Sequence, residues 1–83
     1  MDIVAFRKVE IGKIKARVDI MTSEGFVIKG FKVIEGDNGL FVGMPSERTR
    51  GGKFIDLVQV SDPNLKELLE SLIIDHYLKK TGK

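Results

Sequence analysis

The clearest pattern along the chain is a strict alternation of apolar and polar residues over residues 13–20. Ile14, Ala16, Val18 and Ile20 take every second position, and the positions between them carry three basic residues and one acid. Alternation with a period of two predicts a β-strand that has one face in water, which is typical of an antiparallel sheet. We expect these four apolar residues to lie together on the buried face of that sheet.

Three other segments before Pro45 have the composition of strands. Residues 3–9 precede the alternating strand across a short connection at residues 10–12, so the two segments are expected to pair as a hairpin. Residues 26–35 are rich in β-branched and aromatic residues and predict the longest strand. Residues 40–44 are apolar on both faces, which predicts a strand near the centre of the sheet, covered on both sides.

The segments on either side of residues 40–44 contain strong turn and loop signals. Gly-Asp-Asn-Gly at residues 36–39 predicts a tight hairpin turn, since Asn-Gly favours the positive backbone φ angles that such turns require. Pro45 ends the strand because proline has no N–H for the ladder. Residues 46–52 predict a polar loop, and residues 53–60 predict a fifth strand with imperfect alternation.

The last third of the chain predicts a helix. Ser-Asp-Pro at residues 61–63 indicates its start, because a side-chain oxygen can cap the first amides and proline fits the first turn. Lys79 and Lys80 suit its negative end, and Gly82 is the expected stop. An apolar stripe recurs at helical spacing: Leu65, Leu68, Leu69, Leu72, Ile73 and Tyr77, widened by Ile74 and Leu78. The order of elements predicts an α+β fold in a single domain over residues 1–83, with an antiparallel sheet of four to five strands and a C-terminal α-helix.

The length of 83 residues leaves the expected core thin. Burial of apolar surface contributes on the order of 120 kcal/mol, and ordering the chain at roughly 1.5 kcal/mol per residue costs about the same. With no Cys and one His, neither a disulfide nor a structural zinc of the Cys/His kind can add stability. What remains is oligomerisation or unusually good packing. Of these we expect a homodimer, with strands shared or exchanged between the two copies.

Composition and charge narrow the class of protein without identifying a partner. Hydrophobic residues make up 42% and charged residues 31%, as in an ordinary globular domain. The first ten residues lack the pattern of a signal peptide, and no apolar run approaches a membrane span, so we expect a cytoplasmic protein without membrane insertion. The net charge is only +2, so the distribution of the basic residues decides whether they form a binding surface.

The sequence does not contain the residues of a catalytic or phosphate-binding motif at the required spacing. The nearest carboxylate to His76 is Asp75, which points to a different side of the helix, so a Ser/His/Asp arrangement is not indicated. We expect His76 to be a partly buried helix residue. Gly52-Lys53 lacks the other residues of a phosphate-binding Walker A loop. We predict no enzymatic activity, metal, cofactor or small-molecule substrate.

Basic residues gather in two places. The first is the polar face of the alternating strand and its neighbour: Lys13, Lys15, Arg17, Arg7 and Lys8. This face is either a solvated surface that discourages edge pairing or a contact for a ligand. The second is the loop with Arg48, Arg50 and Lys53, in which Thr49 and glycines add a hydroxyl and approachable amides. Planar guanidinium donors with such groups suit phosphate oxygens.

The stretch VIEGDNGLFVGMPSERT, residues 33–49, resembles the signature of the SpoVG family, the stage V sporulation protein G or septation regulators of bacteria. The resemblance continues more loosely through Gly52, Phe54 and Asp56 to His76-Tyr77 and covers about the last two-thirds of the chain. It implies a small α+β domain that dimerises through shared strands. It also implies a regulator that binds DNA and RNA, is linked to septation and sporulation, and has no enzymatic activity.

The resemblance also implies which residues contact nucleic acid. The family's basic residues after the Met-Pro-Ser element and near the helix correspond to Arg48 and Lys66. Arg50 and Lys53 are basic where the family usually has Pro and an acid, and Glu47 stands where Lys is usual, so the loop keeps a positive balance with different residues. A second hypothesis is a protein-interaction module in cell division that docks through a sheet edge or the helix without binding nucleic acid.

Overall fold

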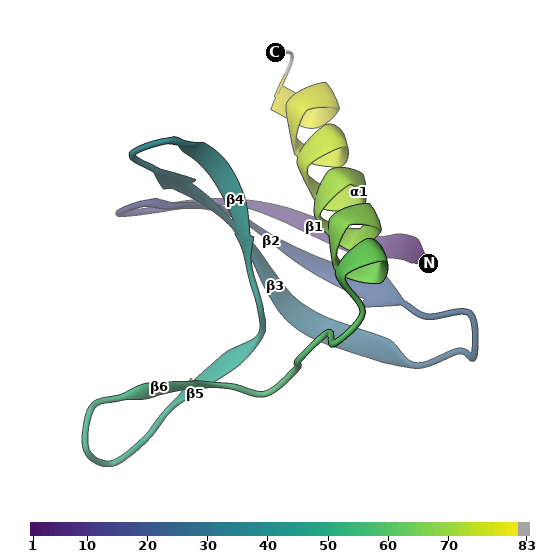
Figure 1. The fold of residues 1–83 in the computed structure, drawn as a ribbon. Helices are drawn as coiled ribbons and strands as arrows, with labels where there is room; N and C mark the ends of the chain where they lie inside the picture. The colour runs from purple at the N-terminus through teal and green to yellow at the C-terminus, as the bar shows by residue number, and fades with distance from the viewer. Residues whose placement is uncertain (82–83) are drawn as a thin grey trace.

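The computed structural model describes residues 1–81 and has the α+β architecture that the sequence predicts (Figure 1). A four-stranded antiparallel sheet has the order β1-β2-β3-β4, and β5 and β6 pair as a separate two-stranded sheet. The strands are β1 (Asp2–Ile11), β2 (Ile14–Met21), β3 (Val27–Gly36), β4 (Gly39–Gly43), β5 (Ser46–Arg48) and β6 (Phe54–Asp56), and they are followed by the helix α1 (Pro63–Thr81). The helix crosses one face of the larger sheet, and the other face is left open (Figure 1).

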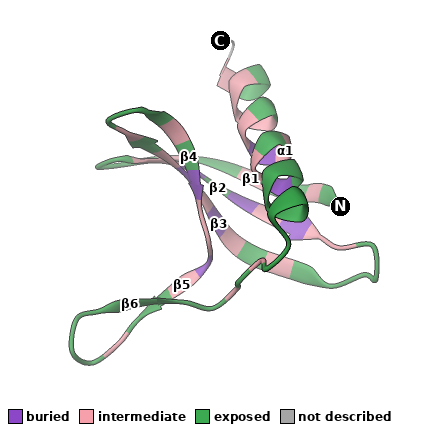
Figure 2. Cartoon of the chain, in the orientation of Figure 1, coloured by how far each residue is buried: buried purple, intermediate pink, exposed green. Residues whose placement is uncertain are grey.

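The core lies between the sheet and α1. Val18 pairs with Phe31, and Ala16 pairs with Val33, so alternate residues of β2 and β3 point to the same side. On that side Leu69 and Ile73 of α1 complete a cluster of buried apolar residues: Ala16, Val18, Ile20, Phe31, Val33, Val42, Leu69 and Ile73. Burial is concentrated on the face of the sheet that α1 covers, where the helix contacts β3 and β4 (Figure 2). The alternation of residues 13–20 therefore predicted three of its four core residues correctly.

Ile14 is the exception, and a register shift is the reason. The pairing of β2 with β3 shifts between Ile14 and Ala16, so that Ile14 pairs with Ile34. Because neighbours along a strand point to opposite faces, the side chain of Ile34 points away from the face on which Val33 is buried. Ile14, as the partner of Ile34, lies on the same face as Ile34. One irregular residue thus moves Ile14 to the open face of the sheet.

β4 lies at an edge of the sheet, so the prediction of a central strand covered on both faces is wrong. β4 pairs with β3 alone within the larger sheet, and the side chain of Phe41 remains 48% exposed on the open face. Val42, on the other face, is buried against the core. Apolar residues on both faces of this short strand therefore reflect burial on one side and an uncovered aromatic ring on the other.

The β3–β4 turn is tight, as predicted, but its dihedral angles differ from the prediction. Gly36 pairs with Gly39, which leaves Asp37 and Asn38 as the two turn residues. Gly39 has a φ of 117°, whereas Asn38 has no positive φ. The positive angle therefore falls on the glycine, where no Cβ opposes it.

Residues 46–60 differ most from the prediction. Ser46–Arg48 form the strand β5 in place of part of a loop, and the fifth predicted strand is reduced to the three residues of β6. β5 and β6 make a hairpin that projects from the rest of the chain (Figure 1). The backbone N–H of Leu57 donates to the carbonyl of Pro45 at 2.7 Å and closes the base of this hairpin.

The helix begins as predicted. Asp62 caps it, since its Oδ1 accepts a hydrogen bond from the backbone N–H of Asn64 at 2.9 Å. Only part of the apolar stripe is covered, because Leu65 and Leu68 remain 43% and 64% exposed. The predicted stop at Gly82 lies outside the described residues. Within residues 1–81, no helix is both long and apolar enough to cross a membrane.

Candidate nucleic-acid interface

The predicted basic loop lies at the far end of the β5–β6 hairpin. Arg48 is the last residue of β5, Arg50 lies in the turn, and Lys53 immediately precedes β6. All three side chains are exposed, in a part of the molecule that is exposed almost throughout (Figure 2). The structure therefore brings these three cations together on one projecting element.

Thr49 shapes this loop through its backbone and its hydroxyl. Its backbone N–H donates to the carbonyl of Lys53 at 2.7 Å, and its carbonyl accepts from the N–H of Gly52 at 3.0 Å. Its Oγ1 accepts a further hydrogen bond from the N–H of Lys53 at 3.3 Å. Gly52 has a φ of 82°, a conformation that favours glycine. The hydroxyl of Thr49 thus holds the turn that carries Arg50 and Lys53.

Lys66 lies apart from the loop within one chain. It is an exposed residue near the start of α1, and its backbone N–H donates to the carbonyl of Asp62 at 2.9 Å. In Figure 1 the β5–β6 loop extends away from this end of the helix. The structure therefore does not join Lys66 to Arg48, Arg50 and Lys53 in a single cluster.

The second basic group of the sequence analysis is divided between the two faces of the sheet. Arg7 pairs with Arg17, on the face opposite to the core. Lys8 pairs with Ala16, which belongs to the core side. Lys15 forms an ion pair with Glu35 at 3.5 Å and lines a hollow near the end of α1 with Tyr77. Lys13 lies in the turn between β1 and β2. Of this group, Arg7 and Arg17 therefore lie together on the open face.

Lys32 is a further cation on the open face that the sequence analysis did not single out. Arg17 of β2 pairs with Lys32 of β3, so Arg7, Arg17 and Lys32 form one row across three adjacent strands. We call this the cation row. Within the isolated β3 sequence, Lys32 is an ordinary polar residue between two apolar ones. The signal that could have found it is the pairing of β2 with β3.

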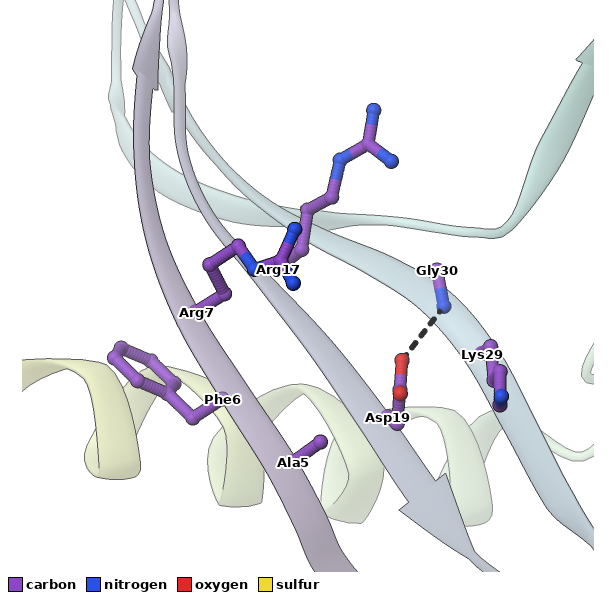
Figure 3. Close-up of a pocket in the computed structure, with 7 residues that line it drawn as sticks. All are labelled: Ala5, Phe6, Arg7, Arg17, Asp19, Lys29 and Gly30. Atoms are coloured by element: carbon purple, nitrogen blue, oxygen red, sulfur yellow. Dashed lines mark hydrogen bonds between the residues drawn. The ribbon is translucent and has the colours of Figure 1, made fainter.

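An open pocket of about 370 Å³ lies beside the cation row. Its lining residues are Ala5, Phe6, Arg7, Arg17, Asp19, Lys29 and Gly30 (Figure 3). Asp19 is directed toward β3, where its Oδ1 accepts a hydrogen bond from the backbone N–H of Gly30 at 3.2 Å. The small residues Ala5 and Gly30 leave the space open between the longer side chains.

The predicted helix residue His76 is half-buried and packs against the sheet. Its ring lies 5.0 Å from that of Phe6, centroid to centroid, at a tilt of 56°. Such tilted contacts are favourable between aromatic rings. Among residues 1–81 there is no group of three or more His, Cys, Asp or Glu side chains that could hold a metal ion. The contact of His76 with Phe6 is one of packing between aromatic rings.

Comparison with known proteins decides the family. The SpoVG family matches residues 1–79. The chain belongs to the SpoVG family. It is 42% identical over 77 residues to a Clostridium perfringens protein named "Putative septation protein SpoVG", with 92% of this chain and 86% of the relative covered. Relatives of the same name are 37% identical in Desulforudis audaxviator, over 89% of this chain and 85% of the relative, and 39% identical in Staphylococcus aureus, over 89% and 75%.

Membership of the SpoVG family confirms the resemblance seen in residues 33–49. The match reaches back to residue 1, so it includes β1 and β2 as well as the last two-thirds of the chain. The SpoVG fold in this chain thus contains both the β5–β6 loop and the cation row.

Proposed function

We propose that this SpoVG-family chain is a homodimeric nucleic-acid-binding regulator linked to septation or sporulation, and that it acts by binding DNA or RNA without catalysing a reaction. The observation that carries the proposal is the exposed loop of the β5–β6 hairpin with Arg48, Arg50 and Lys53. Guanidinium groups donate two parallel hydrogen bonds to phosphate oxygens, and a projecting loop can approach a polyanion without a steric barrier. Lys66 of a second copy could complete the surface.

The uncovered apolar surface supports the dimer. The single chain exposes 6120 Å², whereas a compact monomer of this mass exposes about 5,000 Å². Phe54, Ile55 and Leu57 on and beside β6 are between 50% and 68% exposed. An isolated two-stranded hairpin is at best marginally stable in water. A second copy packed on this hairpin would cover these residues and bring two basic loops into one assembly.

The second candidate function is a protein-interaction module in cell division. The observation that favours it is the exposed start of the α1 stripe, where Leu65 and Leu68 are uncovered. An amphipathic helix with uncovered apolar residues suits docking to a partner protein. Recovery of a protein partner after nuclease treatment, together with no binding to nucleic acid at low salt, would favour this function over the first.

Fluorescence anisotropy with labelled DNA and RNA tests the nucleic-acid proposal. If a dimer neutralises about six phosphates, log affinity falls with log salt at a slope near −5 for duplex DNA. The double variant Arg48→Ala/Arg50→Ala should bind nucleic acid more weakly, and its affinity should depend less steeply on salt concentration. The double variant Lys79→Ala/Lys80→Ala, which removes the same charge at the end of α1, is the control. Equal binding by the loop variant and the wild type would reject the loop as the site.

Analytical ultracentrifugation tests the dimer. We expect a dimer at micromolar concentration and a thermal midpoint that rises with protein concentration, because association stabilises the folded state by mass action. Phe54→Gln should shift the protein toward the monomer, since it removes apolar surface from the hairpin. A stable monomer over this concentration range would contradict the dimer without affecting the test of nucleic-acid binding.

A further inference from the structure

The cation row on the open face places three like charges at paired positions of a sheet, which is an unfavourable arrangement. Arg7, Arg17 and Lys32 occupy directly paired positions on β1, β2 and β3. Like charges directly opposite each other on neighbouring strands destabilise a sheet. Figure 3 shows Arg7 and Arg17 on the face that α1 does not cover, and Lys32 pairs with Arg17 on that face. An anionic ligand on that face would offset their repulsion.

No carboxylate neutralises this row within residues 1–81. Among residues 1–81, the one ion pair with an N–O distance of 4 Å or less joins Lys15 to Glu35, and neither residue belongs to the cation row. The carboxylate nearest in the pocket is Asp19, whose Oδ1 accepts the backbone N–H of Gly30. Lys29 also lines the pocket. The row therefore keeps its positive charge available for a ligand.

An apolar row lies beside the cation row on the same face. Ile14 pairs with Ile34, and Ile34 pairs with Phe41. The ring of Phe41 lies against Gly36, where an added Cβ would stand 2.9 Å from its Cε1, and it remains 48% exposed. Lys32 is two residues from Ile34, so Phe41 is a diagonal neighbour of the cation row. An exposed aromatic ring next to cations can take a nucleic-acid base by stacking.

We propose that the open face of the four-stranded sheet binds a single strand of nucleic acid. Arg7, Arg17 and Lys32 contact its phosphates, and Phe41 stacks on one base. This inference rests on the proposed nucleic-acid binding and extends it from the loop to the sheet. Single strands suit the face because a base that is free of its complement can lie flat on an aromatic ring, whereas the bases of a duplex are stacked inside it.

The charge of the face argues against a second copy of this chain as its occupant. A two-fold contact is made by the same patch on both copies. It would bring Arg7, Arg17 and Lys32 against the same net positive patch of the other copy, in which Asp19 is the one carboxylate that lines the pocket. A polyanion, by contrast, is complementary to this charge.

The cation row is also continuous with the β5–β6 hairpin. Lys32 Nζ donates a hydrogen bond to Ser46 Oγ, the first residue of β5, at 3.3 Å. Arg48 lies two residues further along the same strand. A single strand of nucleic acid that lies across the open face can therefore leave the face at Lys32 and continue along the β5–β6 hairpin toward the basic loop.

The test is an anisotropy titration with a labelled single-stranded oligothymidine of twenty nucleotides and a duplex of equal length, over a range of salt. Arg7→Gln/Arg17→Gln should lower affinity for the single strand about tenfold or more and reduce the magnitude of the salt slope by about 1.4. Phe41→Leu should lower affinity about fivefold or more without changing the slope. Lys79→Gln/Lys80→Gln is the charge-matched control and should bind as the wild type or nearly so.

Each other outcome overturns the inference in a recognisable way. If the Arg7/Arg17 variant binds like the wild type while Arg48→Ala/Arg50→Ala binds weakly, the open face is not the site, and the proposed function stands. If the wild type binds no oligonucleotide at low salt, the proposed function itself is wrong. A variant that changes the oligomeric state in sedimentation would show that the face is an interface between copies. The single variants Arg7→Gln and Arg17→Gln repeat the test should the double variant not fold.

Discussion

Lys32 on β3 donates a hydrogen bond from its Nζ to the Oγ of Ser46 on β5, across 3.3 Å. Within residues 1–81, this is the one side-chain hydrogen bond that joins the four-stranded sheet to the β5–β6 hairpin. Because Lys32 belongs to the cation row and Ser46 begins the strand that carries Arg48, the bond connects the two basic surfaces of the chain. The orientation of the hairpin relative to the open face depends in part on this contact.

Replacement of Ser46 by Ala should loosen the hairpin more than it destabilises the fold. The substitution removes the acceptor for Lys32, and a hydrogen bond to a charged donor of this kind contributes about 1–2 kcal/mol at most when partly exposed. Hydrogen exchange should show faster exchange in β5 and β6 than in β2 and β3. Ser71→Ala, at an exposed position of α1, is the control; equal exchange in Ser46→Ala and Ser71→Ala would contradict the role given to Ser46.

Replacement of Gly30 by Ala should destabilise the protein by about 1–2 kcal/mol, because the φ of 99° at this position is strained for any residue with a Cβ. The added Cβ would meet only Pro45 Cβ at 3.7 Å, so the cost is conformational and not a steric clash. Gly51→Ala is the matched control: its φ is not positive and its Cβ has room, so stability should be unchanged or slightly higher. Urea unfolding of both variants provides the measurement, and equal midpoints would refute the prediction.

Replacement of Ile73 by Ala should cost about 2–5 kcal/mol, because Ile73 is fully buried between α1 and the sheet. Leu68→Ala removes a similar volume from a side chain that is 64% exposed and should cost about 0.5 kcal/mol or less. The free energy of unfolding, measured in urea at low protein concentration, compares the two. A large loss in Leu68→Ala that appears only at high concentration would show that a second chain covers Leu68.

Replacement of Asp62 by Ala should weaken the start of α1 by about 0.5–2 kcal/mol, since the backbone N–H of Asn64 loses its acceptor. Asp62→Asn keeps a side-chain oxygen in the same position and should retain most of the stability. Thermal unfolding followed by circular dichroism at 222 nm measures both variants. An equal loss in the two would mean that the charge of Asp62, and not its acceptor oxygen, stabilises the helix.

The sequence predicted the elements whose signals are local. The alternation of residues 13–20 identified β2, and the Ser-Asp-Pro start and the apolar stripe identified α1, because period and capping depend only on neighbours in the chain. The basic loop was also visible, since Arg48, Arg50 and Lys53 are close together in sequence. The strand β5 was missed, because three residues with the sequence Ser-Glu-Arg carry no apolar alternation.

Other features depend on strand pairing, which a single sequence does not display. The edge position of β4 follows from its having β3 alone as a partner in the sheet, and not from its apolar composition. The shift that turns Ile14 to the open face comes from its pairing with Ile34. A one-residue shift reverses the side on which a residue lies, so an alternating pattern predicts a common face only while the register is regular.

Local sequence signals were therefore enough for the fold class, the helix, the β1–β2 hairpin and the basic loop, since each depends on interactions within a few residues. Only the tertiary structure revealed which cations form the cation row. Arg7, Arg17 and Lys32 are separated in sequence and come together because β1, β2 and β3 pair in one particular register. Hydrogen bonding between strands sets that register, and so it determined which of the chain's cations share a surface.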